Sequence, residues 1–221
     1  MGTHDPAMPS APPASPSRPA TVIALGLGGN LGGRGEIEAA LRLALERLRE
    51  SLGELHIASL YRGPAVVPGG GEPQPDFLNT AAVGRTALQP EAVLAIAKAL
   101  EMAAGRRPGP RFGPRPLDVD LLLYGDLRSA APELTLPHPR LAERRFVLAP
   151  LAEIAPDLPI PALGASASEL LRRLPPAAPP VERLPWSRAG DAGDPGDADR
   201  SGHPGNPSAA PPPRRPEAAK A

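Results

Sequence analysis

Proline divides this chain into a middle that can fold and two ends that are predicted not to. Of the 34 prolines, six lie in residues 1–20 and twelve in residues 175–221. Both ends are otherwise rich in alanine, glycine and serine, so they hold too little apolar surface to offset the conformational entropy that folding removes. We therefore expect disordered tails at 1–20 and 175–221 and one folded domain over 21–174. Trp186, the only tryptophan, could pack the second tail locally onto that domain.

Between these tails, the spacing of apolar residues alternates between strand and helix patterns. Short apolar runs bounded by turn residues predict strands over 21–27, 55–61, 77–83 and 118–124. Helical spacing predicts amphipathic helices over 36–50 and from Pro90 onward, and further short helices at 140–149 and 167–173. The β-α-β-β-α-β order predicts an α+β fold, a split β-α-β arrangement whose mostly antiparallel sheet carries its helices on one face.

Composition excludes several classes of protein. The formal net charge is zero, so the chain as a whole has no basic excess to favour nucleic acid or an anionic membrane. It has no cysteine, which excludes disulfides and thiolate metal sites. Its longest apolar runs fall short of the roughly 20 residues of a membrane-spanning helix, and the first residues lack the apolar segment of a secretory signal. We expect a cytoplasmic monomer with no nucleic-acid or membrane partner.

Two aspartates open the last of the predicted strands. Side chains alternate faces along a strand, so Asp118 and Asp120 emerge on the same face, close enough to hold metal between them. Oxygen ligands of this kind suit Mg²⁺, which takes one or two protein carboxylates and completes its shell with water and substrate phosphates. Aspartates at the start of a strand are also common turn residues, and such a pair alone is more often structural.

The segment before this strand favours the metal interpretation. Residues 105–116 contain four arginines, whose planar guanidinium groups suit phosphate oxygens. Arginine in a loop is usually a solvated surface residue, and this chain has only two lysines, so no single arginine is informative. The combination of an arginine loop, paired acids and an apolar strand in one short segment predicts metal-dependent phosphoryl-type transfer.

The familiar nucleotide-binding loops are absent from the sequence. It contains no G-x-x-x-x-G-K-[ST] loop, and Leu31 stands where the dinucleotide fingerprint requires its third glycine. If the chain binds a nucleotide, arginine and metal must therefore hold the phosphates. Two long loops rich in glycine and proline flank the acid pair in this topology, and loops of such length are typical of lids over a site.

Three phenylalanines lie beside polar residues. Phe77 precedes Asn79, Phe112 lies between two arginines, and Phe146 follows two more. They could be ordinary core residues, but planar rings with an amide partner would suit a flat heteroaromatic substrate, stacked and recognised at its edge. His138 also stands out, because it is held between two prolines ahead of an arginine-containing segment, although a structural role is an equal alternative.

These residues lie in motifs that resemble one known family, 6-hydroxymethyl-7,8-dihydropterin pyrophosphokinase. The resemblance covers residues 21–160 and keeps the order of the family's motifs. Its segments are 28–31, 59–64, 76–79, 111–122, 137–140 and 144–148. Among them, the Arg-x-Gly-Pro-Arg-x-x-Asp-x-Asp run that ends at Asp120 is a specific signature of the family.

The resemblance implies a ferredoxin-like α+β fold and a reaction of folate biosynthesis. In that reaction diphosphate passes from ATP to the hydroxymethyl group of 6-hydroxymethyl-7,8-dihydropterin, and AMP is released. The resemblance implies that Asp118 and Asp120 hold two Mg²⁺ ions and that Arg106 and Arg115 engage the transferring diphosphate. ATP binding is implied for Arg106, Arg115, His138 and Arg144. Pterin binding is implied for Gly63, Pro64, Val66, Phe77, Asn79, Phe112 and Phe146. Glu101 matches a recurring acidic position of the family.

The match departs from the family pattern in places. Gly29 replaces a usual serine, and Gly63 stands where threonine is frequent. The arginine loop is slightly shorter than in some relatives, so Arg107 and Arg111 have no firm counterparts. Two other functions stay open on the residues alone. One is a non-catalytic ferredoxin-like module that binds nucleotide or RNA through the arginine loop, and the other is a metal-dependent transferase acting on another flat alcohol.

Overall fold

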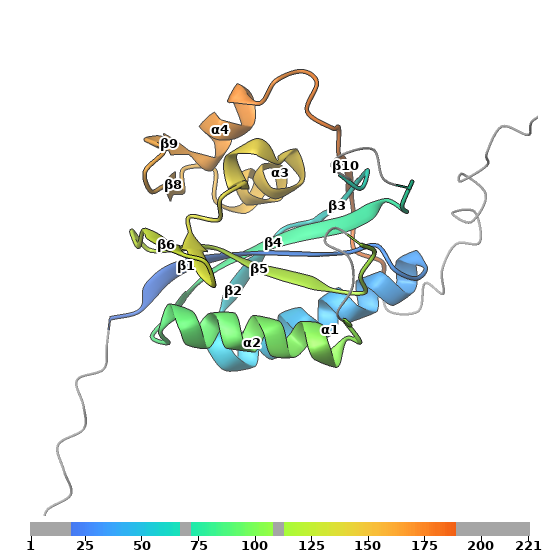
Figure 1. Ribbon diagram of the computed structural model, residues 1–221, viewed down its shortest axis with the longest axis horizontal. Helices are drawn as coiled ribbons and strands as arrows, with labels where there is room; N and C mark the ends of the chain where they lie inside the picture. Colours follow the sequence, from blue (N-terminus) through green and yellow to red (C-terminus); the bar gives the residue numbers. More distant parts are fainter. Residues whose placement is uncertain (1–18, 67–71, 108–112, 189–221) are drawn as a thin grey trace, which may run out of the picture.

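The computed structural model describes residues 19–66, 72–107 and 113–188. Its main sheet runs in the order β10-β3-β4-β1-β5, with β2 also pairing with β4, and every pair is antiparallel (Figure 1). The strands of this sheet are β1 (Thr21–Gly29), β2 (Leu55–Ile57), β3 (Leu60–Gly63), β4 (Phe77–Thr86), β5 (Asp118–Tyr124) and β10 (Glu182–Leu184). The predicted α+β fold with a mostly antiparallel sheet is confirmed.

Helices cover both faces of the sheet (Figure 1). They are α1 (Arg34–Leu52), α2 (Pro90–Ala103), the 3-10 helix η1 (Leu141–Glu143), α3 (Arg145–Ile154) and α4 (Ala167–Arg173). α1 and α2 lie on one face, and α3 and α4 lie on the other. The expectation of helices on one face only is therefore wrong, because Ala24 and Leu122 make the second face apolar enough to bury α3. Within the described ranges, no helix combines the length and hydropathy needed to cross a bilayer.

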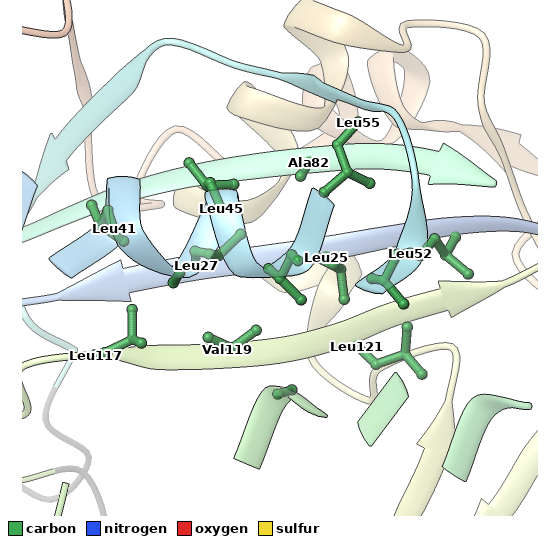
Figure 2. Packing of buried hydrophobic residues seen from close by; sticks show 14 of the residues in the cluster. Leu25, Leu27, Leu41, Leu45, Leu52, Leu55, Ala82, Leu117, Val119 and Leu121 are labelled. Atoms are coloured by element: carbon green, nitrogen blue, oxygen red, sulfur yellow. The ribbon is translucent and has the colours of Figure 1, made fainter. Parts of the chain in front are cut away.

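The larger core cluster lies between the sheet and α1. Leu25 and Leu27 of β1 pack with Leu41 and Leu45 of α1 in one continuous apolar layer (Figure 2). Two small hairpins complete the fold, β6 (Ser129–Ala131) with β7 (Leu134–Leu136) and β8 (Pro159–Ile160) with β9 (Ala165–Ser166).

Some predicted boundaries need correction. The strand predicted over 55–61 is two strands, β2 and β3, separated at Ala58 and Ser59. The Ala58 carbonyl accepts hydrogen bonds from Thr80 Oγ1 at 3.1 Å and Trp186 Nε1 at 3.0 Å, so side chains replace a ladder partner there. The helix predicted at 140–149 begins as η1 and continues as α3 to residue 154.

Ordered structure also extends past the predicted domain boundary at residue 174. Residues 182–184 form β10, which pairs with β3, and Trp186 packs against the core cluster on the α1 side. Pro180 and Pro185 lie just outside β10, so the strand itself keeps all its backbone N–H groups. The predicted tail at 175–221 must therefore be corrected for residues 175–188. Residues 1–18 and 189–221 lie outside the described residues, so the rest of the tail predictions stay predictions.

Candidate active site

Asp118 and Asp120 lie at the start of β5. Strand alternation directs Val119 into the core on the α1 side and turns both aspartates the other way, where they line a cavity of about 810 Å³. Their partners across β1 are Gly28 and Gly26. A Cβ on Gly28 would meet the Asn79 amide and one on Gly26 would meet Leu122, so these two side chains occupy the space that the glycines leave.

Two arginines pair with Asp118. Arg106 Nη1 lies 2.6 Å from Asp118 Oδ1, and Arg115 Nη1 lies 3.1 Å from Asp118 Oδ2. Burial alone would raise the pKa of Asp118, but the two guanidinium charges outweigh it and hold this pKa below its usual value. Burial and the charge of Asp118 raise the pKa of Asp120. The pair therefore contains one firmly ionised carboxylate and a second whose ionisation an added cation would favour.

Glu101 of α2 connects the helix to this pair. Its side chain is 3% exposed and accepts from the Val119 backbone N–H at 2.9 Å and from Lys98 Nζ at 3.0 Å. It also contacts Arg106 Nη1 at 2.5 Å. Burial is the largest influence on the pKa of Glu101 and raises it. Glu101 does not line the cavity, so its structural effect is to hold Arg106 and the start of β5 in place.

Asn30, at the end of β1, joins the loops around the cavity. Its Oδ1 accepts from the Arg115 backbone N–H at 2.9 Å, and its own backbone N–H donates to the Arg115 carbonyl at 3.0 Å. Its Nδ2 donates to Gln74 Oε1 at 3.3 Å and to the Pro75 carbonyl at 3.2 Å. Asn30 is fully buried and was not among the predicted site residues, although it belongs to the Gly-Gly-Asn-Leu motif.

His138 follows β7 on a segment that approaches β5. Its backbone N–H donates to the Leu122 carbonyl at 2.9 Å, and its Nδ1 accepts from the Arg140 backbone N–H at 3.3 Å. Burial, reinforced by the positive charge of Arg144, lowers the pKa of His138 to about 4, so the ring is neutral at neutral pH. A neutral ring whose Nδ1 accepts carries its proton on Nε2, a donor suited to a phosphate oxygen.

Another part of the cavity wall is apolar and aromatic. Phe77 and Asn79, two positions apart on β4, line it together with Phe146 at the start of α3. Asn79 Nδ2 lies 3.5 Å from the Tyr61 carbonyl oxygen. A side chain at Gly28 would bring its Cβ within 2.5 Å of Asn79 Oδ1, so the amide occupies space that only glycine leaves free.

The structure brings most of the predicted site residues around one cavity. Those that line it are Pro64, Val66, Phe77, Asn79, Arg106, Arg115, Asp118, Asp120, His138, Arg144 and Phe146. Gly63 instead lines a neighbouring cavity of about 190 Å³, together with Pro64 and Val66. Phe112 lies outside the described residues. Lys98 and Arg140 also line the main cavity and were not predicted. The position of Lys98, three residues before Glu101 on α2, is the one signal that could have identified it.

Basic side chains outnumber acidic ones around the cavity. Within the described residues its carboxylates are Asp118 and Asp120, and its basic side chains are Lys98, Arg106, Arg107, Arg115, Arg140 and Arg144. The described part of the chain contains no group of three or more His, Asp or Glu that could cage a metal ion. Two carboxylates in a basic cavity fit a cation such as Mg²⁺ that completes its shell with phosphate oxygens. The arrangement therefore fits a polyphosphate with its metal.

Comparison with known proteins identifies similar sequences. Residues 24–156 match the family model described as 7,8-dihydro-6-hydroxymethylpterin-pyrophosphokinase (HPPK). The chain is 36% identical over 159 residues to 2-amino-4-hydroxy-6-hydroxymethyldihydropteridine pyrophosphokinase of Synechocystis sp., covering 68% of this chain and 74% of that protein. It is 40% identical over 162 residues to the protein of the same name from Methylorubrum extorquens, covering 72% and 96%.

Comparison with solved structures supports the fold. The chain resembles Plasmodium falciparum HPPK-DHPS, wild type, with a TM-score of 0.54 and 14% sequence identity. The match covers 72% of this chain but only 45% of the longer Plasmodium falciparum chain. At this level of identity the likeness concerns the fold alone.

Proposed function

This chain belongs to the 7,8-dihydro-6-hydroxymethylpterin-pyrophosphokinase family, and from that premise we propose which of its residues carry the reaction. It is a diphosphotransferase of folate biosynthesis that moves diphosphate from ATP to the hydroxymethyl group of 6-hydroxymethyl-7,8-dihydropterin and releases AMP. The hydroxymethyl oxygen forms a bond to the β-phosphorus, and the bond from that phosphorus to the oxygen of AMP breaks. The alternative of a non-catalytic nucleotide- or RNA-binding module is not favoured.

One observation carries the residue assignment: a single cavity joins the acid and arginine cluster to the aromatic wall. Asp118 lies on the edge strand β5 and Phe146 lies on α3, which covers one face of the sheet, yet both side chains line this cavity. A reaction between two substrates needs both in one place, because proximity and orientation contribute a large part of the rate. We assign the arginine-rich end to ATP and the aromatic wall to the pterin.

Asp118 and Asp120 are proposed to hold two Mg²⁺ ions together with phosphate oxygens of ATP. When bound, such ions neutralise phosphate charge and polarise the phosphorus under attack. Asp118 stays ionised beside its two arginines. Burial and the negative charge of Asp118 raise the pKa of Asp120, so added positive charge favours the loss of the Asp120 proton.

Arg106 and Arg115 are assigned to the transferring diphosphate. A guanidinium group has five N–H donors, and contact with Asp118 uses only part of them, so each arginine can also bind a phosphate oxygen. His138, neutral and with its proton on Nε2, and Arg144 are assigned to the phosphates of ATP. Donors fixed in advance in this way stabilise charge as it develops on the transferred group.

Phe77, Phe146 and Asn79 are assigned to the pterin ring. Stacked rings hold a flat ring in one plane, and an amide can both donate to and accept from the edge of that ring. Asn79 is 6% exposed, so its amide faces little solvent that would compete with a ligand. Pro64, Val66 and Phe112 complete the proposed pterin-binding set, and Gly63 precedes Pro64 and lines the neighbouring cavity.

The enzyme is further proposed to act as a monomer. Within the described residues, one chain supplies every side chain of the cavity, so a second copy is not needed to complete it. Equilibrium sedimentation tests this proposal, and a stable dimer would contradict it. The cytoplasmic location likewise stays a proposal from the sequence, which fractionation of cells producing the tagged chain would test.

The reaction itself provides the test of the proposed function. AMP release from ATP is measured with and without 6-hydroxymethyl-7,8-dihydropterin, and again in the presence of EDTA. The proposal expects AMP only when ATP, the pterin and Mg²⁺ are all present. AMP formation that is independent of the pterin, or release of ADP in place of AMP, would contradict it.

A further inference from the structure

A C-terminal strap, defined as residues 175–188, connects the two helical layers around the edge of the sheet. It leaves the end of α4 on one face, pairs with β3 through β10, and reaches α1 on the other face (Figure 1). We propose that this strap positions the pterin-binding wall of the active site, with Val181 as the positioning residue. This inference rests on the proposed function, because it concerns the site assigned there to the pterin.

The far end of the strap is fixed to α1 and to the link between β2 and β3. Ser187 donates to both oxygens of Glu38, through its backbone N–H at 2.9 Å and its hydroxyl at 3.0 Å. Trp186 Nε1 donates to the Ala58 carbonyl at 3.0 Å, and the Arg42 guanidinium lies 4.8 Å from the centroid of the Trp186 ring. The Glu38 side chain is 3% exposed, so this end of the strap is held by a buried acceptor.

The middle of the strap meets β3 and α3 at one carboxylate. Glu153 of α3 accepts from Arg183 of the strap at 2.6 Å, from the Ser59 hydroxyl at 2.7 Å and from the Tyr61 hydroxyl at 3.0 Å. Burial, together with the hydrogen bond to Glu153, raises the pKa of Tyr61 to about 12, so the phenol stays a donor. The strap therefore connects β3 with the helix that begins beside Phe146.

The start of the strap touches the proposed pterin wall directly. A Cβ added to Gly63 would lie 2.9 Å from Val181 Cγ1 and 3.4 Å from the Pro180 carbonyl oxygen, so the strap packs closely on the last residue of β3. The next residue, Pro64, lines the main cavity. Val181 and Pro180 also share the cavity of about 190 Å³ with Pro64 and Phe146. The strap therefore lies behind the parts of the proposed pterin wall that Pro64 and Phe146 form.

The strap contacts the pterin end of the active site more closely than the metal end. No described strap residue lines the main cavity, so the strap acts on a substrate only through the residues it supports. With the strap docked, Val181 and the Pro180 carbonyl lie against Gly63, so this residue cannot move toward the strap and carry Pro64 away from the cavity. The side chains assigned to the metal and the transferring diphosphate lie on β5 and around it, at the opposite edge of the sheet, whereas Arg144, assigned to ATP, shares the small cavity with the strap. Loosening the strap should therefore weaken pterin binding more than ATP binding.

A matched pair of substitutions tests the anchor. Trp186→Phe removes the donor to the Ala58 carbonyl, whereas Tyr124→Phe removes a donor to the Leu88 carbonyl, at 2.7 Å, on the opposite edge strand. We expect Trp186→Phe to raise KM for the pterin by about threefold or more, and to raise KM for ATP less. Tyr124→Phe should change neither constant. Acrylamide quenching of Trp186, the single tryptophan, gives an independent measurement. We expect stronger quenching in Glu38→Gln than in the wild-type chain, because the strap is then released from α1.

A second pair tests the contact itself. Gly63→Ala places a methyl group against Val181, and we expect it to raise KM for the pterin by about tenfold. The double variant that also carries Val181→Ala lacks Cγ1 and should return KM for the pterin most of the way to the wild-type value, with KM for ATP constant throughout. A general loss of stability would not give a rescue confined to the pterin constant. If the wild-type chain releases no AMP, the proposed function fails. If it does, but every variant leaves KM for the pterin unchanged or raises both KM values equally, the strap inference alone is overturned.

Discussion

Arg106 Nη1 lies 2.6 Å from Asp118 Oδ1, so a side chain assigned to phosphate is paired with a side chain assigned to metal. Arg106 also contacts Glu101, and Arg115 contacts the second oxygen of Asp118 at 3.1 Å. Asp118 is therefore held between two arginines within the protein. A polyphosphate with its cations offers the arginines a negative neighbour and Asp118 a positive one. The assignment of the arginines to phosphate and of the aspartate to metal can therefore be tested separately.

Removing the charge of either aspartate should stop the reaction without unfolding the chain. We expect Asp118→Asn and Asp120→Asn each to lower kcat by about 100-fold or more, because the carboxylates are assigned to the metal that stabilises the transferring group. AMP release measures the effect, and circular dichroism checks the fold. Asp126→Asn is the matched control, since Asp126 is exposed just after β5 and does not line the cavity. Turnover close to wild type in either active-site variant would reject the assignment.

Truncating Phe146 should affect one substrate only. Loss of a stacked face predicts that Phe146→Ala weakens pterin binding by about 1–3 kcal/mol, with little change in ATP binding. Isothermal titration calorimetry with each substrate measures the difference. Ile154→Ala, at the other end of α3 and packed against the same core cluster, controls for general weakening of the helix. Unchanged affinity for the pterin in Phe146→Ala would remove this ring from the site.

The neutral state of His138 predicts a loss of stability in acid. The folded chain keeps the pKa of His138 near 4, well below its ordinary value of 6.5, because the ring is buried and faces Arg144. Between these two pH values the unfolded chain binds a proton at this histidine that the folded chain does not. The free energy of unfolding is therefore unaffected by this group above about pH 6.5 and decreases as pH falls toward about 4. Urea denaturation across this range should show a smaller loss for His138→Asn than for wild type.

The control for that experiment removes a different histidine. His56 is exposed on β2, so His56→Asn should keep the wild-type dependence of unfolding free energy on pH. Equal losses of stability in wild type and His138→Asn would show that His138 is not the group responsible.

Two substitutions at Glu101 separate its shape from its charge. Burial already raises the pKa of Glu101, so Glu101→Gln, which keeps an acceptor for the Val119 N–H, should cost little stability. Glu101→Ala leaves that buried N–H without its acceptor and should lower the free energy of unfolding by about 1–3 kcal/mol. Thermal and urea denaturation of both variants make the comparison. A larger loss in the Gln variant than in the Ala variant would contradict this account.

Elements with strong local signals were predictable from the sequence. The helix at 167–173 has a capping box, in which Ser166 Oγ accepts from the Glu169 N–H and Glu169 Oε2 accepts from the Ser166 N–H. The strand at 118–124 combines an apolar run with two aspartates at alternating positions, so its register and its polar face could both be inferred. The arginine loop directly precedes this strand in the sequence, so the loop and the acid pair could be recognised as one site without knowledge of the fold.

Features that depend on distant partners were not predictable. β10 is three residues long and follows several prolines, and its order comes from β3, which lies about 120 residues earlier in the chain. Lys98 reaches the cavity only because α2 packs beside β5. Gly63 was grouped with the main site, but Val181 of the strap places it against a second cavity. In each case the deciding contact joins segments that are far apart in the sequence.

Asp118 and Asp120 are proposed to hold the metal ions of the bound ATP together. The most direct test is a crystal structure with a non-hydrolysable ATP analogue and Mn²⁺, with the metal located by anomalous scattering. We expect two anomalous peaks coordinated by oxygens of both aspartates and of the analogue, with Arg106 and Arg115 turned to the phosphates. Anomalous peaks away from both carboxylates, with Asp118 still paired to its arginines, would contradict it.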